Sequence, residues 1–283
     1  MAGVSTKEIK NRIKSMESTR QITKAMEMVA SSKLRRAQAQ ISNSRPYFEI
    51  LRNTIQEIVN SDQEFSSPYL TRQNAGKTMY IVIAGDRGLA GGYNSNILKL
   101  VMQDMEGKDA TVLPIGKKAV DYFKSHNVPI LTDCYAVAAD ISVGDCFSAA
   151  KQLCNAYLNQ EYAEVFVAYT NFVSVLSQVP TSMKLLPLEP READASPSGT
   201  QKTMTEYEPS SEAVFAAIVP EYLGGVLYGA LCESRAAEQA ARRTAMDAAT
   251  SNADDMIADL SLKFNRARQA AITSEIIDIV AGS

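Results

Sequence analysis

The sequence has little of the side-chain chemistry that most enzymes use. Among its 283 residues there is one histidine, His126, and no tryptophan, which argues against a histidine-based triad or a multi-histidine metal site. We interpret His126 as a surface or turn residue. The four cysteines (Cys134, Cys146, Cys154 and Cys232) are far apart and form no CxxC pair, which is neither a zinc pattern nor a disulfide framework. We therefore expect reduced thiols, no bound metal and no cofactor.

Long hydrophobic runs and a strong net charge are also missing. No stretch approaches 18 uninterrupted apolar residues, and the N-terminal segment lacks the apolar core of a signal peptide, which predicts a soluble protein that is not exported. The net charge is −3, which argues against a general nucleic-acid binder. Hydrophobic residues make up 46% of the chain, enough to bury a sizeable core.

The charge that is present differs between the two ends of the chain. Residues 1–60 carry eleven Lys or Arg against five Asp or Glu, a balance of +6, whereas residues 208–283 carry six against eleven, a balance of −5. Opposite charges are compatible with pairing of the two ends, although exposed ion pairs add only a few tenths of a kcal/mol each.

Apolar residues at spacings of three and four predict one long helix between Lys7 and Val59. Pro46 is the only strong breaker in this span, and we expect it to kink or divide the helix. The predicted apolar stripe changes phase along its length and consists of Ile9, Ile13, Met16, Ile22, Met26, Val29, Ala30, Leu34, Ala37 and Ile41.

The strongest helix signal runs from Glu221 to the end of the chain. This stretch contains no proline, and the last glycine before Gly282 is Gly229, which predicts a helix of more than fifty residues. Its small side chains are typical of a slim coiled coil, so we expect the two terminal helices to pair antiparallel as a rod that projects from a globular middle. The predicted seam is Leu223, Leu227, Ala230, Ser234, Ala237, Ala241, Thr244, Ala248 and Ser251, continued by Met256, Leu260, Phe264, Ala267 and Ala271.

The middle of the chain alternates β-rich and helical segments, which predicts a parallel, Rossmann-like sheet. Two further β-rich runs flank Asn171 as in a hairpin, and a Pro- and Ser-rich stretch at 189–205 is predicted to be an exposed loop. The expected strands are 77–84, 110–115, 128–131, 164–170 and 172–188, and the expected helices are 94–105, 117–125 and 143–158.

The predicted fold is therefore α/β, with a long antiparallel coiled coil of N- and C-terminal helices plus a central Rossmann-like α/β domain. The N-terminal coiled-coil helix is placed at 1–60, the central domain at 61–207 and the C-terminal coiled-coil helix at 208–283.

One glycine-rich segment, Gly85–Asn94 (GDRGLAGGYN), follows a predicted strand and precedes a predicted helix. Nucleotide-binding folds place their phosphate loops at this point. However, its glycines are spaced GxxGxxGG instead of GxGxxG, and the chain contains no GK[ST] motif. We interpret the segment as a tight turn that also faces a partner, with a nucleotide-binding α/β enzyme as the alternative.

Two charged clusters complete the candidate sites. Asp254, Asp255 and Asp259 form an acidic helix face without a calcium-loop pattern, and we interpret it as solvated. The basic cluster at 33–36 lacks interleaved aromatic residues, so an acidic protein loop is favoured over nucleic acid as its partner. A helical adaptor or chromatin protein is a further alternative. No set of residues supplies a nucleophile with its base or a metal shell, so the residues predict a mechanical or interaction protein without catalytic residues.

Three segments resemble one known family. Ile22–Leu34 (ITKAMEMVASSKL) resembles the N-terminal signature of the gamma subunit of F-type ATP synthases, Asp86–Asn94 (DRGLAGGYN) resembles that family's DRGLCGGYN, and residues 238–275 resemble its C-terminal signature. The resemblance spans essentially the whole chain. Ala90, Phe264 and Arg243 depart from the usual Cys, Tyr and Met. No inserted regulatory cysteine loop or transit peptide is recognised, which favours the bacterial type.

The resemblance implies a subunit that is not an enzyme on its own. It implies a central rotor shaft that couples proton-driven rotation of the membrane c-ring to conformational changes in the catalytic beta subunits, for ATP synthesis or hydrolysis. The implied partners are three alpha and three beta subunits per gamma, the epsilon subunit and the c-ring, with no nucleic acid. The implied location is peripheral, at the cytoplasmic face of the bacterial inner membrane.

The resemblance also implies contact residues. Lys24, Met26, Arg242, Gln269 and Thr273 are the implied contacts with the alpha and beta ring. Without the resemblance, Met26 would be assigned to a helix core, and Arg242 and Gln269 would be assigned to the solvent. For the c-ring, the implied contacts are Tyr207 and Glu208.

Overall fold

The computed structural model describes residues 6–61, 65–73, 76–135, 137–189 and 207–282. Its contacts divide the chain into two compact units. We call residues 33–241 the sheet unit, and residues 1–32 together with 242–283 the coiled-coil unit. Helices α1 (Thr6–Ser61) and α5 (Ser211–Ala281) each contribute to both units. The division into 1–60, 61–207 and 208–283 stays a prediction.

The sheet unit is built on four strands in the order β2-β1-β3-β4. Strand β1 is parallel to β2 and β3, while β4 runs antiparallel to β3 at one edge. A short 3₁₀ helix, η1 (Pro68–Leu70), precedes the sheet. The strand bounds are Lys77–Ile83 for β1, Ala110–Ile115 for β2, Tyr162–Phe172 for β3 and Gln178–Leu186 for β4.

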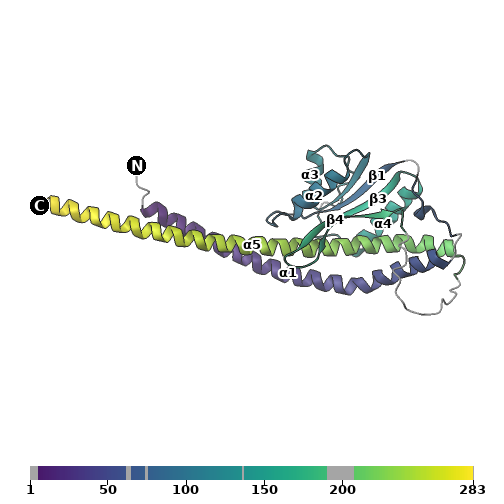
Figure 1. The fold of residues 1–283 in the computed structure, drawn as a ribbon, viewed down its shortest axis with the longest axis horizontal. Coiled ribbons are helices and arrows are strands. Elements are labelled where there is room, and N and C mark those ends of the chain that lie inside the picture. Colours follow the sequence, from purple (N-terminus) through teal and green to yellow (C-terminus); the bar gives the residue numbers. More distant parts are fainter. Residues whose placement is uncertain (1–5, 62–64, 74–75, 136, 190–206, 283) are drawn as a thin grey trace. The chain divides into compact units, whose positions relative to one another are not determined.

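Helices cover both faces of this sheet (Figure 1). Side chains of β1 alternate between the faces, because successive residues of a strand point in opposite directions. Tyr80 and Val82 pack against α2 (Tyr93–Asp104) and α3 (Lys117–Ser125), whereas the intervening residues pack against α4 (Val143–Leu158), α1 and α5. The predicted α/β fold with a Rossmann-like sheet and long terminal helices is confirmed.

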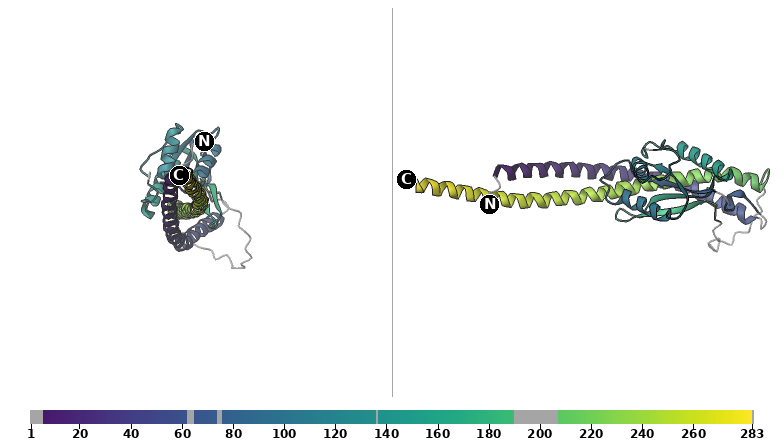
Figure 2. Two further views of the ribbon diagram at one scale, coloured as in Figure 1. Left: turned by 90° about the vertical axis from the view of Figure 1, so that its left-hand side faces the viewer. Right: turned by 90° about the horizontal axis from the view of Figure 1, so that it is seen from above.

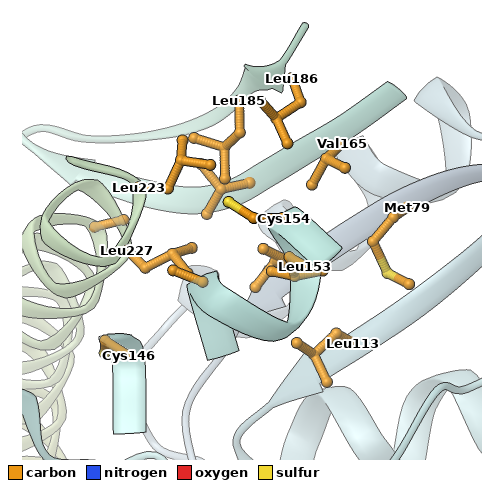
Figure 3. Close-up of a cluster of buried hydrophobic side chains, with 14 of the residues drawn as sticks. Met79, Leu113, Cys146, Leu153, Cys154, Val165, Leu185, Leu186, Leu223 and Leu227 are labelled. Carbon is orange, nitrogen blue, oxygen red and sulfur yellow. The ribbon is translucent and has the colours of Figure 1, made fainter. Parts of the chain in front are cut away.

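The larger core lies between the sheet, α4 and α5 (Figure 3). Leu223 and Leu227 of α5 lie beside Leu185 of β4 and Leu153 of α4 in this close-up. All four side chains are buried, and each buried leucine contributes roughly 1.5–3 kcal/mol of transfer free energy. This core fixes the first part of α5 to the sheet.

In each unit the parts of α1 and α5 run antiparallel (Figures 1 and 2). In the sheet unit, Leu34 and Ala37 pack against Ala236 and Ala240. In the coiled-coil unit, the hydroxyl oxygens of Thr23 and Thr250 are 2.8 Å apart, and Arg20 pairs with Asp254 at 3.3 Å. Residue numbers rise along one helix as they fall along the other. The predicted antiparallel pairing is therefore confirmed within each unit.

Both long helices pass through a proline, so Pro46 does not divide α1 and Pro220 does not mark the start of α5. Helix α1 continues through Pro46, and α5 begins at Ser211 with Pro220 inside it, ten residues before the predicted start. Pro46 is exposed, on the solvent side where a helix bends at little cost. Pro220 follows the fully buried Val219, so packing into the core offsets the lost backbone hydrogen bond.

The strict seam predicted for α5 is correct only in its first part. The predicted residues from Leu223 to Ala237 are buried, but Thr244, Ala248 and Ser251 are exposed. Met246 and Ala253 are buried in their place. A straight α-helix drifts by about 20° per heptad relative to a strict seven-residue repeat, so over four heptads the facing position moves to neighbouring residues. On α1, Ala30 of the predicted stripe is buried, but Ile22 and Val29 are exposed and the polar Thr23 is buried instead.

Three predictions in the middle segment need correction or lie outside the described residues. The expected strand at 128–131 is a single bridge between Val112 and Ile130, because Pro129 has no N–H to donate to a ladder. Asn171 lies within β3, opposite Val179, and the hairpin connection falls between Phe172 and Gln178. The loop expected at 189–205 lies outside the described residues except for its first one.

Part of α5 is long and apolar enough to cross a membrane by length and composition alone. Its most apolar 18-residue window has a mean hydropathy of 1.5, and 44% of that window is buried within the structure. The core helix of a soluble protein has the same properties. We assign the apolarity of this helix to its packing against the sheet, where Phe215, Leu223 and Leu231 are fully buried.

Candidate functional site

The glycine-rich turn at the end of β1 is closed by its own side chains. The Oδ1 atom of Asn94 accepts a hydrogen bond from the Gly85 N–H at 2.8 Å, and its Nδ2 donates to the Arg87 carbonyl at 3.1 Å. One side chain thus joins both ends of the turn. The predicted strand-to-helix turn is confirmed, since α2 begins directly after Gly92.

Asp86 connects this turn to two other segments of the sheet unit. Its carboxylate accepts hydrogen bonds from the backbone N–H groups of Lys117 at 3.3 Å, Ala138 at 2.8 Å and Ala139 at 3.1 Å. Both oxygens are therefore used within the fold. A carboxylate held in this position also repels a phosphate group.

Helix α5 covers the turn from the other side. Ala90 and Tyr93 form a buried cluster with Ala237, and the Tyr93 hydroxyl lies 2.8 Å from the Ser234 hydroxyl. The Glu238 carboxylate lies 3.1 Å from the place where a β-carbon on Gly85 would stand. A phosphate at this turn would meet two carboxylates and a packed helix. The geometry supports a packing junction and not the alternative of a nucleotide-binding enzyme.

Arg235 completes the junction, and the sequence reading missed it. Its Nη2 donates hydrogen bonds to the carbonyl oxygens of Ala138, Ala139 and Ile141. The segment 137–141 is thus held through its N–H groups by Asp86 and through its carbonyl groups by Arg235. The sequence offers one signal for this role of Arg235: a charged residue stands within an alanine-rich helical stretch that is predicted to form a packed seam.

The cysteines have the character of core residues, with one exception. All four are free, and only Cys134 is exposed. Burial raises the pKa of Cys146 and of Cys154 to about 12, so their thiols stay protonated near neutral pH. Among the described residues, no group of three or more His, Cys, Asp or Glu could hold a metal ion.

Of the two predicted contact residues on α1, Lys24 lines a shallow hollow of the coiled-coil unit. Lys24 is exposed and pairs with Glu27 at 2.7 Å, and its hydrogen bond to Glu27 raises the pKa of Lys24. Met26 is half-buried. The hollow has a volume of about 440 Å³ and is lined by Arg20, Gln21, Lys24, Ala25, Met28, Thr250 and Asp254.

The predicted contact residues on α5 fall into two groups. Arg242 is half-buried, and the charges of the nearby Arg243 and Asp247 act on Lys24, so these residues lie in one region. Gln269 and Thr273 are exposed, and the Thr273 hydroxyl donates to the Gln269 carbonyl at 2.9 Å. Twenty-seven residues of helix separate Arg242 from Gln269, which is roughly 40 Å at 1.5 Å per residue.

Large apolar side chains are exposed along the coiled-coil unit. Ile22 and Val29, which the sequence reading assigned to the core, are 58% and 55% exposed. Large apolar side chains left exposed in this number along two paired helices favour an interface. We call this set the apolar shaft surface. It consists of Ile22, Met28, Val29, Met256, Leu262, Ile272, Ile276 and Ile277.

The two residues predicted to contact the c-ring lie just before α5. Tyr207 is half-buried and packs against the larger core of the sheet unit, while Glu208 is exposed. Only Glu208 therefore presents most of its side chain to a partner in this structure.

Comparison with known proteins points to one family. A family model described as ATP synthase matches residues 5–283. The ATP synthase gamma chain of Ruminococcus albus is 43% identical over 98% of this chain and 97% of its own length, and that of Alkaliphilus metalliredigens is 42% identical over 99% and 98%.

A solved structure shares the fold. The matching chain belongs to the Euglena gracilis mitochondrial ATP synthase, in a structure of OSCP, F1 and c-ring in rotational state 3. The two chains are 19% identical with a TM-score of 0.66, over 98% of this chain and 93% of the other.

Proposed function

This chain belongs to the gamma-chain family of ATP synthases, as a non-catalytic subunit of the central stalk, and from that premise we propose how its surfaces meet the rest of the complex. The coiled-coil unit is the shaft that enters the ring of alternating alpha and beta subunits. The sheet unit is the part that faces the c-ring and epsilon. Rotation driven by ion flow then reaches the catalytic beta subunits as a change in the shaft surface that each one meets.

The apolar shaft surface carries this proposal. An exposed isoleucine contributes roughly 1.5–3 kcal/mol once a partner covers it. Neither helix can bury Ile22 or Val29 against the other, because their own pairing uses Thr23 and Ala30. A surrounding sleeve of protein covers such side chains on all sides of a slim coiled coil.

Polar contacts with the ring are proposed for the residues that the family resemblance indicated. Lys24 and Met26 on α1 and Arg242 on α5 form the first group, and Gln269 with Thr273 forms the second. The roughly 40 Å between the two groups along α5 is compatible with contacts at two different levels of the ring. Lys24 is exposed and held by Glu27, so it is placed to meet an acidic loop.

The surroundings of the complex complete the proposal. One gamma chain serves three alpha and three beta subunits and turns together with epsilon and the c-ring. Tyr207 and Glu208 are proposed to lie on the c-ring side. The protein is peripheral, on the cytoplasmic face of the bacterial inner membrane, and takes part in ATP synthesis and ion transport without binding a nucleotide itself.

The test uses membranes depleted of their gamma chain and reassembled with variants of this one. Wild-type chain is expected to restore ATP-driven ion pumping. Ile22→Asp is expected to weaken assembly with the head at least tenfold, because it loses the apolar burial and adds a charge. Asn43→Asp, an exposed change of the same charge elsewhere on α1, is the matched control. Equal assembly of the two variants would contradict a ring-facing apolar surface.

The proposed polar contacts are tested in the same membranes. Arg242→Ala and Gln269→Ala are expected to lower ATP hydrolysis or its coupling to pumping without changing the amount of assembled complex. Unchanged turnover and unchanged coupling would remove both residues from the contact set.

A further inference from the structure

A small set of directional hydrogen bonds fastens the sheet to α5, next to the glycine-rich turn. We propose that Arg235 is a positioning residue of the rotor, which fixes the sheet to α5 so that both turn as one body. This inference rests on the proposed function as a rotor. It concerns contacts within the sheet unit alone.

The α5 side of this junction consists of two consecutive polar residues. Ser234 is fully buried, and its hydroxyl lies 2.8 Å from the Tyr93 hydroxyl and 3.5 Å from the Thr170 N–H of β3. The Arg235 guanidinium contacts three carbonyl oxygens of the segment 137–141. One turn of α5 therefore reaches the glycine-rich turn, a central strand and the segment before α4.

The sheet side of the junction runs through Asp86. This residue lies three positions after the end of β1, and its carboxylate holds the N–H groups of Ala138 and Ala139. Arg235 holds the carbonyl groups of the same residues. A continuous path therefore runs from β1 through Asp86 and the segment 137–141 to Arg235 on α5.

Apolar packing on the C-terminal side of Arg235 cannot supply the same directional hold. The buried residues that follow Arg235 on the helix are Ala236, Ala237 and Ala240, whereas the fully buried Leu231 lies one turn before it. Alanine side chains bury little area and present a smooth surface, so they resist sliding weakly. Hydrogen bonds from a planar guanidinium to fixed carbonyl groups depend on direction and distance, so they resist both rotation and sliding of α5 against the sheet.

The proposal is tested in gamma-depleted membranes reassembled with Arg235→Gln, Arg235→Lys or Lys99→Gln. Lys99 is exposed on α2, so its variant is a control for the loss of one positive charge. Two quantities are measured: the number of ions pumped per ATP hydrolysed, and ATP hydrolysis by the detached head. Hydrogen exchange of residues 137–141 reports whether the segment is released.

Arg235→Gln is expected to lower the pumping-to-hydrolysis ratio at least twofold, with hydrolysis by the detached head unchanged and exchange of 137–141 faster. Arg235→Lys keeps the charge but not the planar guanidinium whose Nη2 makes the three hydrogen bonds, and its ratio should fall between those of wild type and Arg235→Gln. Lys99→Gln should match wild type. A wild-type ratio in Arg235→Gln with faster exchange would overturn the proposal, because the arginine would then only stabilise the segment.

Two further observations keep the outcomes separate. If Arg235→Gln does not assemble, the proposal is tested with Asp86→Asn, which weakens the same path from the other end. This variant is also expected to lower the pumping-to-hydrolysis ratio. A wild-type ratio in Asp86→Asn would overturn the proposal. If the wild-type chain itself fails to restore pumping, the rotor function is refuted instead, and the positioning role falls with it.

Discussion

Replacing Gly116 by alanine should destabilise the sheet unit more than any other single glycine-to-alanine change near the glycine-rich turn. Gly116 lies between β2 and α3 with φ +93° and ψ 144°, a region that side chains with a β-carbon rarely adopt. A β-carbon there would stand 2.2 Å from the Ala84 carbonyl oxygen. That oxygen belongs to the backbone at the end of β1 and cannot move away without breaking the parallel pairing of β1 with β2.

The magnitude follows from two contributions. Backbone strain of this kind costs of order 1–3 kcal/mol, and forcing an extra carbon into a packed site typically costs a further 1–3 kcal/mol. The free energy of unfolding should therefore fall by about 4 kcal/mol. A domain of this size loses about 2–4 °C in Tm per kcal/mol, so the melting temperature should fall by roughly 8–16 °C.

The assay is thermal and urea unfolding of the isolated chain, followed by circular dichroism. Gly88→Ala is the matched control, because a β-carbon there meets nothing within 4 Å and the backbone is not left-handed. That variant should be neutral or more stable by up to about 1 kcal/mol through a stiffer unfolded chain. The reasoning is refuted if Gly116→Ala unfolds within about 1 kcal/mol of Gly88→Ala.

Two further predictions concern titratable groups of the sheet unit. A maleimide at pH 7.5 should modify Cys134 rapidly and leave Cys146 and Cys154 unmodified until the chain is unfolded, because burial keeps the pKa of both buried thiols at about 12. Mass spectrometry of the labelled native protein checks this prediction. Early labelling of either buried thiol would contradict it. Burial also raises the pKa of Glu233, which Arg45 partly opposes in a hollow that Glu49 and Arg52 also line. The stabilising contribution of Glu233 is therefore present below its unfolded pKa of about 4.3 and is lost as the pH rises through its folded pKa. In urea unfolding, Glu233→Gln should be more stable than wild type at pH 7.5 and equally stable near pH 3.5. Equal stability of the two proteins at both pH values would show that the carboxyl is not desolvated.

The fold class could be predicted from the sequence because its signals are local. Helical spacing without glycine over more than fifty residues of α5, and short β-rich runs between helices, need no knowledge of distant contacts. The exact seam could not be predicted, because which side of a helix is buried depends on the partner helix. Apolar spacing alone therefore placed Ile22 and Val29 inside together with Ala30, while the packed helices bury Ala30 and the polar Thr23.

The junction around Arg235 could be predicted only in part. The glycine-rich turn was located correctly, since Gly85–Asn94 connects a strand to a helix. What Asp86 and Arg235 hold could not be predicted, because their common target, residues 137–141, is about fifty residues from one and about one hundred from the other. Hydrogen bonds to backbone groups leave no pattern in side-chain types, so no spacing in the sequence reveals them.

Two adjacent alanines of α5, Ala236 and Ala237, are both fully buried. Consecutive residues of a helix point about 100° apart, so one faces α1 and the other faces the glycine-rich turn. A larger side chain at either position would push apart elements on a different side. The tightest limit on variation in this helix should therefore fall on its smallest side chains, and an engineer who attaches a probe or cross-linker to α5 should leave this turn untouched.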